Sequence, residues 1–154
     1  MDIQTWIKPA FSVIGKEGAT TDGADFIQRL WESANAHFEE VAHLAKRDVT
    51  GVPLGFWGAM TDFSRSFRPW EDGFSRGLYL AGVESEEVAE APEGWVKWTV
   101  PGFEYLRAAC GSHTLFADML AYLSEQGLEL AGAVQDFTDP ATGRNFMLFP
   151  VRRL

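Results

Sequence analysis

Two hexapeptides in this chain share the pattern W-x-x-P-x-F. The first, WIKPAF, covers residues 6–11, and the second, WTVPGF, covers residues 98–103 of the 154-residue sequence. Proline has no N–H group to donate to a β-ladder, so within sheets it is confined to edges, strand ends and bulges. A proline held between two large aromatic residues is therefore an unusual arrangement. Its recurrence in the second half of the chain predicts an internal duplication.

The segments that follow the two hexapeptides also share one order. In the first half, apolar residues recur at helical spacing from Phe26 to Ala45, and strand-like segments follow at 51–62 and 77–84. In the second half, a helical pattern lies within 112–127, and strand-like segments follow at 132–140 and 145–151. Each half is thus predicted to be a strand–helix–strand–strand unit.

A unit of this size is too small to bury a core of its own. We therefore expect one α+β domain over residues 1–154, with repeats at approximately 1–84 and 93–154 joined by an acidic linker at 84–93. The repeats are expected to pack about a pseudo-twofold axis as antiparallel sheets, with the two main helices flanking a central groove. Interfaces between subdomains are common places for ligand pockets.

Composition narrows the possible partners. The net charge of −9 disfavours nucleic acid, which is bound mainly through Lys and Arg. No apolar run reaches the roughly 20 residues of a membrane span, and the N-terminus does not read as a signal peptide, so we expect a cytoplasmic protein. Cys110 is the only cysteine, and His37, His43 and His113 lack the spacing of metal ligands. No metal and no cofactor are expected.

Aromatic residues are abundant, with six Trp and twelve Phe. A small core rarely needs so many, and we expect some of them to line the groove. The candidate ligand-binding residues are Trp57, Trp70, Tyr79, Glu104, Tyr105, Phe137 and Phe146. Small neighbours leave space above Trp57 for a stacked ring, Trp70 lies in a proline-containing loop that could act as a lid, and the tyrosines carry a hydrogen-bonding tip. Core packing is the alternative for each aromatic residue, and for Phe137 and Phe146 it is the favoured expectation.

Several segments together resemble the GyrI-like small-molecule-binding domains, which are also the effector-binding domains of bacterial multidrug-responsive transcription activators. The segments are FIQRLW, GFWGAMTDFSRSFRPW, LYLAGVE, APEGWVKWTVPGFEYLRAACG and NFMLFPV, and they span nearly the whole chain. The resemblance implies the tandem fold, a groove between the two helices, and binding of flat, often cationic, aromatic compounds. The DNA-binding part of the activators is not present, so the stand-alone form is expected.

The chain departs from that family at its acidic position. Members often carry a Glu in the second strand of the second half, in a pattern like E-x-Y, whereas this chain has Gln135, Asp136 and Phe137 there. The groove acid is therefore sought at Glu104 or at Glu84. Solvent exposure is the alternative for Glu104, and for Glu84, at the start of the acidic linker, it is the favoured expectation.

The function expected first is a cytoplasmic binding protein for amphipathic, often cationic, aromatic small molecules, serving multidrug recognition or sequestration. It has no catalytic residue. The alternative is a GyrI-like hydrolase of strained-ring, cyclopropanoid DNA-alkylating compounds, with Glu104 as the acid or base and Tyr105 or Tyr79 assisting. A second alternative is a regulator that binds a protein such as DNA gyrase. The sequence names no protein partner, and it favours neither nucleic acid nor a membrane.

Overall fold

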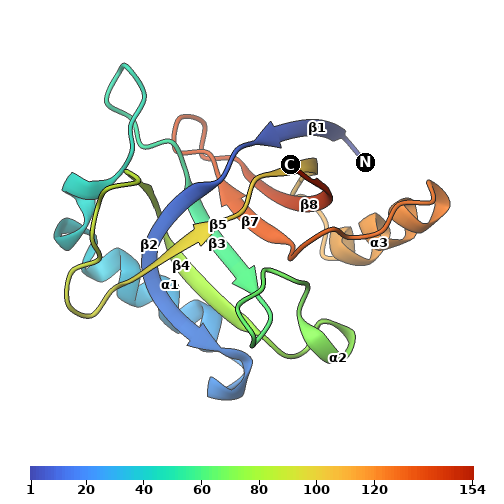
Figure 1. Cartoon of the computed structure of the whole chain (residues 1–154), viewed down its shortest axis with the longest axis horizontal. Helices are drawn as coiled ribbons and strands as arrows, with labels where there is room; N and C mark the ends of the chain where they lie inside the picture. The colour runs from blue at the N-terminus through green and yellow to red at the C-terminus, as the bar shows by residue number, and fades with distance from the viewer.

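All the strands belong to one antiparallel sheet with the order β1-β6-β8-β7-β3-β4-β2-β5 (Figure 1). The computed structural model describes residues 1–154. The strands are β1 (Ile3–Lys8), β2 (Phe11–Ala19), β3 (Phe56–Thr61), β4 (Leu78–Ser85), β5 (Val96–Val100), β6 (Phe103–Ala109), β7 (Gln135–Thr138) and β8 (Asn145–Arg153), and the helices are α1 (Phe26–Ala36), α2 (Glu71–Phe74) and α3 (Leu115–Glu125). None of the helices is long and apolar enough to cross a membrane.

The sheet order reads the same from both edges once β1 is matched with β5, β2 with β6, β3 with β7 and β4 with β8. This confirms the α+β fold class and the pseudo-twofold arrangement. The strand–helix–strand–strand order appears in both halves, and each half also has a further strand in front of it. In each half, one strand ends before the proline of the hexapeptide and a second strand begins after it.

That division explains the repeated hexapeptide. Pro9 lies between β1 and β2, and Pro101 lies between β5 and β6. Neither connection forms a hairpin, because β1 pairs with β6 and β5 pairs with β2. At each proline the chain therefore crosses from one half of the sheet to the other, where no ladder hydrogen bond is required of the proline nitrogen. Trp6 and Trp98 occupy matching places on the two exchanged edge strands.

The first helical pattern is interrupted in the structure. α1 ends at Ala36, and two short 3₁₀ turns, Phe38–Glu40 and Ala42–Leu44, continue the segment. Val41 is nevertheless fully buried, because the turns keep the apolar side of the segment against the sheet. The helical spacing thus predicted the buried face correctly, and the predicted helix length was too great.

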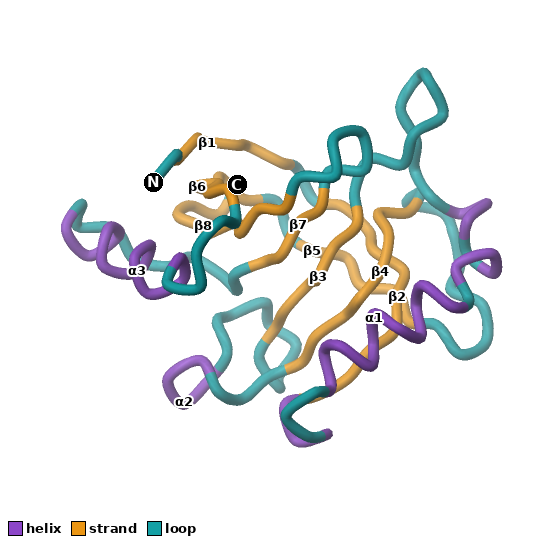
Figure 2. The backbone as a smooth tube through the Cα atoms, turned by 180° about the vertical axis from the view of Figure 1, so that it is seen from behind, coloured by secondary structure: helices purple, strands orange, loops and turns teal.

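The two long helices lie on one side of the sheet and leave β3 and β7 between them (Figure 2). α1 packs on β2 and β4, and α3 packs on the side of β6 and β8 through a cluster that includes Met119 and Phe149. The opposite face of the sheet holds the largest core cluster, in which Trp57, Leu80 and Tyr105 are fully buried. The molecule therefore has a helix-bearing face with a central gap and an opposite face filled by aromatic packing.

Strand pairing locates the pseudo-twofold axis. The β2 residue five positions after Phe11 pairs with a residue of β4, and that residue pairs in turn with Gly58 on β3. In the second half, the β6 residue five positions after the equivalent Phe103 pairs with a residue of β8, and that residue pairs with Asp136 on β7. Gly58 and Asp136 are thus equivalent, and they also pair with each other. The axis passes between them, at the middle of the gap that separates the helices.

Candidate functional site

Gly58 and Asp136 form the centre of the floor between the helices. Side chains alternate between the two faces of a strand, so Asp136 points to the helix-bearing face while Gln135 and Phe137 point to the other. Gly58 has a steric reason to lack a side chain, since a Cβ there would clash with the hydroxyl oxygen of Tyr79. The glycine allows the Tyr79 ring to lie across β3 and reach β7.

A chain of hydrogen bonds ends at the Asp136 carboxylate. The indole Nε1–H of Trp31 on α1 donates to the Tyr79 hydroxyl oxygen over 3.0 Å, and the Tyr79 hydroxyl donates to Oδ2 of Asp136 over 3.0 Å. No Lys, Arg or His forms an ion pair with Asp136. The floor therefore carries one carboxylate with a neutral partner.

Burial shapes the protonation of these groups. It raises the pKa of Asp136 to about 6, and the hydrogen bond from Tyr79 opposes that rise only in part. Burial also raises the pKa of Tyr79 well above its usual value, and the nearby Asp136 charge adds to the effect. At neutral pH the tyrosine is protonated and the carboxylate is mostly ionised. An ionised, partly buried carboxylate without a cation is unfavourable, and a cationic ligand would relieve it.

Two cavities lie in the groove, one on each side of the axis. The first, which we call the acid cavity, has a volume of about 210 Å³. Its lining includes Trp31, Phe56, Gly58, Tyr79, Asp136 and Phe146, together with Cys110, Phe137, Thr138 and Asn145. It thus combines aromatic walls with a single charged group.

The second, which we call the apolar cavity, has a volume of about 200 Å³. It is lined by Met60, Trp70, Phe74, Phe116, Ala133, Val134 and Met147, all of them hydrophobic. Pairing about the axis relates Met60 to Thr138 and Phe56 to Val134. The two cavities are therefore equivalent halves of one groove with different chemistry.

A buried glutamine separates β3 from β7 beside the apolar cavity. The Gln135 side chain accepts from the Met60 N–H through Oε1 at 2.8 Å and donates to the Met60 carbonyl through Nε2 at 3.3 Å. These bonds replace the backbone pairing that would otherwise join Met60 to Val134, and the ladder between β3 and β7 ends at Gly58 and Asp136. The strands are held together by a side chain where the cavity floor begins.

The loop between β3 and β4 closes the apolar cavity. Four non-glycine residues of this loop, Arg65, Phe67, Asp72 and Phe74, have positive φ angles, a conformation that costs about 1–2 kcal/mol for most residues. The ring of Phe74 meets Phe116 of α3 edge-on at 5.1 Å between centroids. The loop thus bridges to the second helix and forms one wall of the groove.

The structure brings four of the candidate residues to these cavities and places three elsewhere. Trp70 lines the apolar cavity, and Tyr79 lines the acid cavity. Phe137 and Phe146 border the acid cavity, but their side chains are buried in the aromatic core of the opposite face. Trp57 and Tyr105 are fully buried on the opposite face, in the aromatic core. They offer no surface to the groove, because strand alternation turns both side chains away from the helices.

The two glutamates that were candidates for the groove acid also lie outside it. Glu104 is partly exposed on β6 and pairs with Arg152 at 3.0 Å. Glu84 is only 2% exposed, so it is not the solvated linker residue that was expected. Its carboxylate accepts from Lys8 and from the Trp57 indole, each at 3.1 Å, on the face opposite the groove.

Asp136 is the acid of the groove, and the family resemblance missed it by one position. The family pattern directed attention to Gln135 and Phe137, whose side chains face the core. Alternation along 134–138 offered the missing signal, since it sets Asp136 on the face opposite those two residues. Trp31 and Met60 were also missed, and only the facing of α1 and β3 reveals them.

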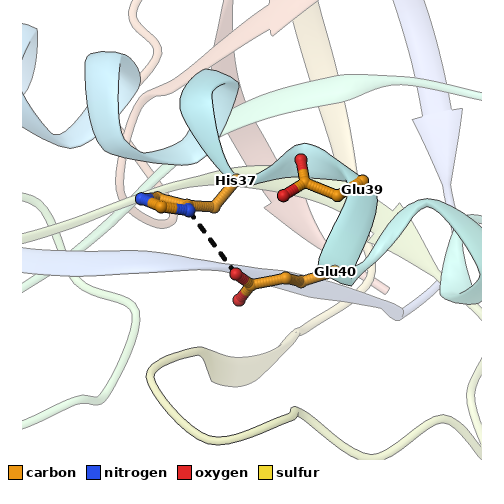
Figure 3. Close-up of side chains that lie close together, drawn as sticks. All are labelled: His37, Glu39 and Glu40. Carbon is orange, nitrogen blue, oxygen red and sulfur yellow. Dashed lines mark ion pairs between the residues drawn. The ribbon is translucent and has the colours of Figure 1, made fainter.

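One cluster elsewhere has the composition of a metal site. His37, Glu39 and Glu40 lie together after the end of α1 (Figure 3), and all three are exposed. His37 Nδ1 lies 3.5 Å from Oε2 of Glu40, whose Oε1 accepts from the indole of Trp95 at 3.0 Å. Glu40 thus joins the 3₁₀ turn after α1 to Trp95, and the cluster is not part of the groove.

Comparison with family models finds no match, and neither does comparison with curated protein sequences. Solved structures are similar over nearly the whole chain. SAV2435 bound to tetraphenylphosphonium matches with a TM-score of 0.67 and 14% identity over 99% of this chain and 94% of that one. The C-terminal domain of EcmrR matches with a TM-score of 0.64 and 11% identity over 99% and 98% of the two chains.

EcmrR in its DNA complex matches with a TM-score of 0.68 and 10% identity, and there the alignment covers 99% of this chain but only 58% of the EcmrR chain. A hydrolase from Listeria innocua matches with a TM-score of 0.52 and 12% identity over 97% and 91% of the chains. At these identities the similarity establishes the fold. The chain has the fold of the GyrI-like small-molecule-binding domains.

Proposed function

We propose that this protein binds amphipathic aromatic small molecules, cations among them, in the groove between α1 and α3, and that it serves to recognise or sequester such compounds in the cytoplasm. The observation that carries the proposal is the Asp136 carboxylate. It lies among aromatic side chains, its pKa of about 6 leaves it mostly ionised at neutral pH, and no cationic side chain pairs with it.

A ligand cation would supply the missing countercharge. Coulomb attraction grows as the effective dielectric falls, and Asp136 is partly buried. Contact of the cation with the face of Trp31 would add about 0.5–2 kcal/mol. SAV2435, which has the same fold, was solved with tetraphenylphosphonium, an aromatic cation. That structure supports the class of ligand proposed for this chain.

The test compares a cation with a neutral analogue. Calorimetry is used to measure binding of tetraphenylphosphonium and of triphenylphosphine oxide to the wild type, to Asp136→Asn and to Glu104→Gln. Asp136→Asn is expected to weaken the cation at least tenfold and to leave the neutral compound unchanged. Glu104→Gln removes the same charge outside the groove and serves as the matched control. Equal weakening by both variants would reject Asp136 as the specific determinant.

A hydrolase is the second candidate, and Asp136 favours it as well. A carboxyl group with a pKa of about 6 is suited to give or take a proton near neutral pH, and the fold also occurs in a hydrolase from Listeria innocua. In this alternative Asp136 takes the role first assigned to Glu104, and Tyr79 takes that of Tyr105. Incubation with a strained-ring, cyclopropanoid compound would then yield a ring-opened product, and Asp136→Asn would abolish it.

A further inference from the structure

The two cavities of the groove are equivalent by position and opposite in chemistry. The acid cavity contains Asp136, whereas every residue that lines the apolar cavity is hydrophobic. Their volumes are nearly equal, about 210 and 200 Å³. A ligand that occupied only one of them would leave half of the groove unused.

Tyr79 forms the boundary between the cavities. Its ring extends from β4 over Gly58, and its hydroxyl bonds to Asp136 on β7. Met60 and Val134 lie on one side of the Tyr79 side chain, and Phe56 and Thr138 lie on the other. This side chain lies across the floor of the groove. The ring is only 1% exposed and packs with Phe26 and Trp31 of α1, so a ligand segment that joins the two cavities runs over the side chains that cover it.

We infer that the groove takes a ligand of two parts: a cationic group in the acid cavity and an uncharged aromatic or branched alkyl group in the apolar cavity, joined by a short linker that crosses Tyr79. This inference rests on the proposed function, because the cationic part is the ligand that Asp136 is proposed to bind. It adds the second part, the spacing between the parts, and the residues that receive the second part.

The lining of the apolar cavity selects an uncharged group. Its one hydrogen-bonding side chain, the indole of Trp70, already donates to the Leu78 carbonyl, so a polar group placed there would lose its bonds to water without replacement. An apolar cavity of about 150 Å³ is large enough to take up benzene, so about 200 Å³ accommodates one aromatic ring. Met60 and Met147 are flexible and polarizable, which suits rings of differing shape.

The geometry of β3 sets the length of the linker. Met60 lies two residues beyond Gly58 on the same strand, and a strand rises by about 3.3 Å per residue. The ring site thus begins about 7 Å from the axis where Asp136 lies. A linker of a few methylenes spans this distance, whereas a single methylene does not.

The first experiment uses the wild-type protein and a series of phenylalkyl-trimethylammonium ions whose chain grows by one methylene at a time. Affinity is measured by calorimetry, with tetramethylammonium as the cationic part alone. The inference predicts a maximum at the length that spans about 7 Å, at least tenfold tighter than tetramethylammonium. Hydrophobic transfer alone would instead give a steady gain of about fourfold per methylene, and a steady rise would overturn the inference.

Variants then locate the second part. Met60→Trp fills the apolar cavity. It is expected to remove the maximum in affinity with chain length, while tetramethylammonium binding stays within about twofold of the wild type. Phe116→Ala opens the wall on α3 and is expected to weaken the best ligand in the same selective way, so the test does not depend on one variant folding. Ile7→Ala, an exposed apolar residue on β1, is the control. Unchanged length dependence in both groove variants would contradict the inference.

The reactivity of Cys110 reports whether the cationic part of the ligand occupies the acid cavity. It is the only cysteine, it is exposed, and it lines the acid cavity. Tetramethylammonium is expected to slow its alkylation by iodoacetamide in the wild type but not in Asp136→Asn. If cations bind and protect Cys110 without a length maximum, the two-part inference fails and the proposed function stands. If no cation of the series binds, both fail.

Discussion

Asp136 lies at a position where the negative charge of its carboxylate destabilises the folded chain. Its pKa is raised to about 6, chiefly by burial. The folded protein therefore holds this proton more tightly than the unfolded chain, whose Asp has a pKa of about 3.9. Stability from this group is present at low pH and is lost as pH rises from about 4 to about 6. Groups that weaken a fold in this way are often retained for function.

The first prediction follows from that sign. Asp136→Asn keeps an acceptor for the Tyr79 hydroxyl and removes the charge, so it is expected to stabilise the protein at pH 8 by up to about 3 kcal/mol. At pH 4 the two proteins should have nearly equal free energies of unfolding, because Asp136 is already protonated. Urea unfolding at the two pH values measures this. A variant that is less stable than the wild type at pH 8 would show that the carboxylate is structural.

The second prediction concerns ligand binding and pH. The affinity for tetraphenylphosphonium is expected to be constant above about pH 7 and to fall by up to tenfold per unit below about pH 6, as Asp136 takes up a proton. Tyr79 and Cys110 are the other titratable groups beside this carboxyl. Their pKa values are raised, so both remain neutral over this range. Calorimetry from pH 5 to 8 measures the profile, and a flat profile would dissociate binding from Asp136.

Individual site residues were only partly predictable. Trp70 and Tyr79 were named from local features, a proline-containing loop and a polar tip on a strand. To assign Asp136 and Trp57, one must know which face of β7 and of β3 is covered by the helices. A sequence segment of four or six residues does not determine that. The role of Gly58 depends on a ring that comes from β4, which no local pattern contains.

At the scale of elements, the exchanged strands hold the two halves together. β1 ends at Lys8, whose ammonium lies 3.1 Å from the buried carboxylate of Glu84 on β4. The same ammonium lies 4.6–5.7 Å from the ring centroids of Phe11, Trp6 and Trp57. An aromatic box closed by a carboxylate thus receives a lysine of the same chain and fixes the crossover at Pro9.

The third prediction tests this attachment. Lys8→Ala leaves the Glu84 carboxylate buried without its cation, and loss of one partner of a buried pair costs about 3–5 kcal/mol. Urea unfolding at neutral pH is expected to show that loss. Lys16→Ala, which removes a lysine that also lies over an indole, Trp95, but has no buried acid, is the control and should cost less than about 1 kcal/mol. Similar losses in both variants would reject the role given to Glu84.

The helices and the inner strands were predictable because the spacing of apolar residues along the sequence identifies them. The exchange of β1 and β5 was not, since it depends on which distant strand supplies the ladder. The repeated hexapeptide marked both places, but its proline was expected at an edge or a bulge and not at a crossover. A proline flanked by aromatic residues is compatible with both a bulge and a crossover, and only the partner strands distinguish the two.

For the whole molecule, the exchange makes each half incomplete without the other. β6 lies between β1 and β8, and β2 lies between β4 and β5, so the second strand of each half is bordered by the first strand of the other. The largest core cluster also takes Phe11 and Trp57 from one half and Phe103 and Phe137 from the other. The molecule is expected to unfold as one cooperative unit.

The fourth prediction divides the chain within the predicted linker. Peptides covering residues 1–92 and 93–154 are each expected to lack stable structure by circular dichroism and dispersed NMR signals. Mixed together they should associate and regain the spectrum of the intact protein, because each supplies the edge strand that the other lacks. Independent folding of either peptide would contradict the shared core.

The position of Asp136 on the axis has a consequence for how such a site can arise. Two identical copies of one repeat, assembled as a symmetric dimer, would place the same residue on both sides of that axis. They would present either two carboxylates in contact, which repel and share a proton, or none. Two repeats within one chain can differ in sequence, so one strand carries Gly58 while its counterpart carries Asp136. A single charge at the centre of a twofold-related pocket thus requires two repeats that differ in sequence at that position.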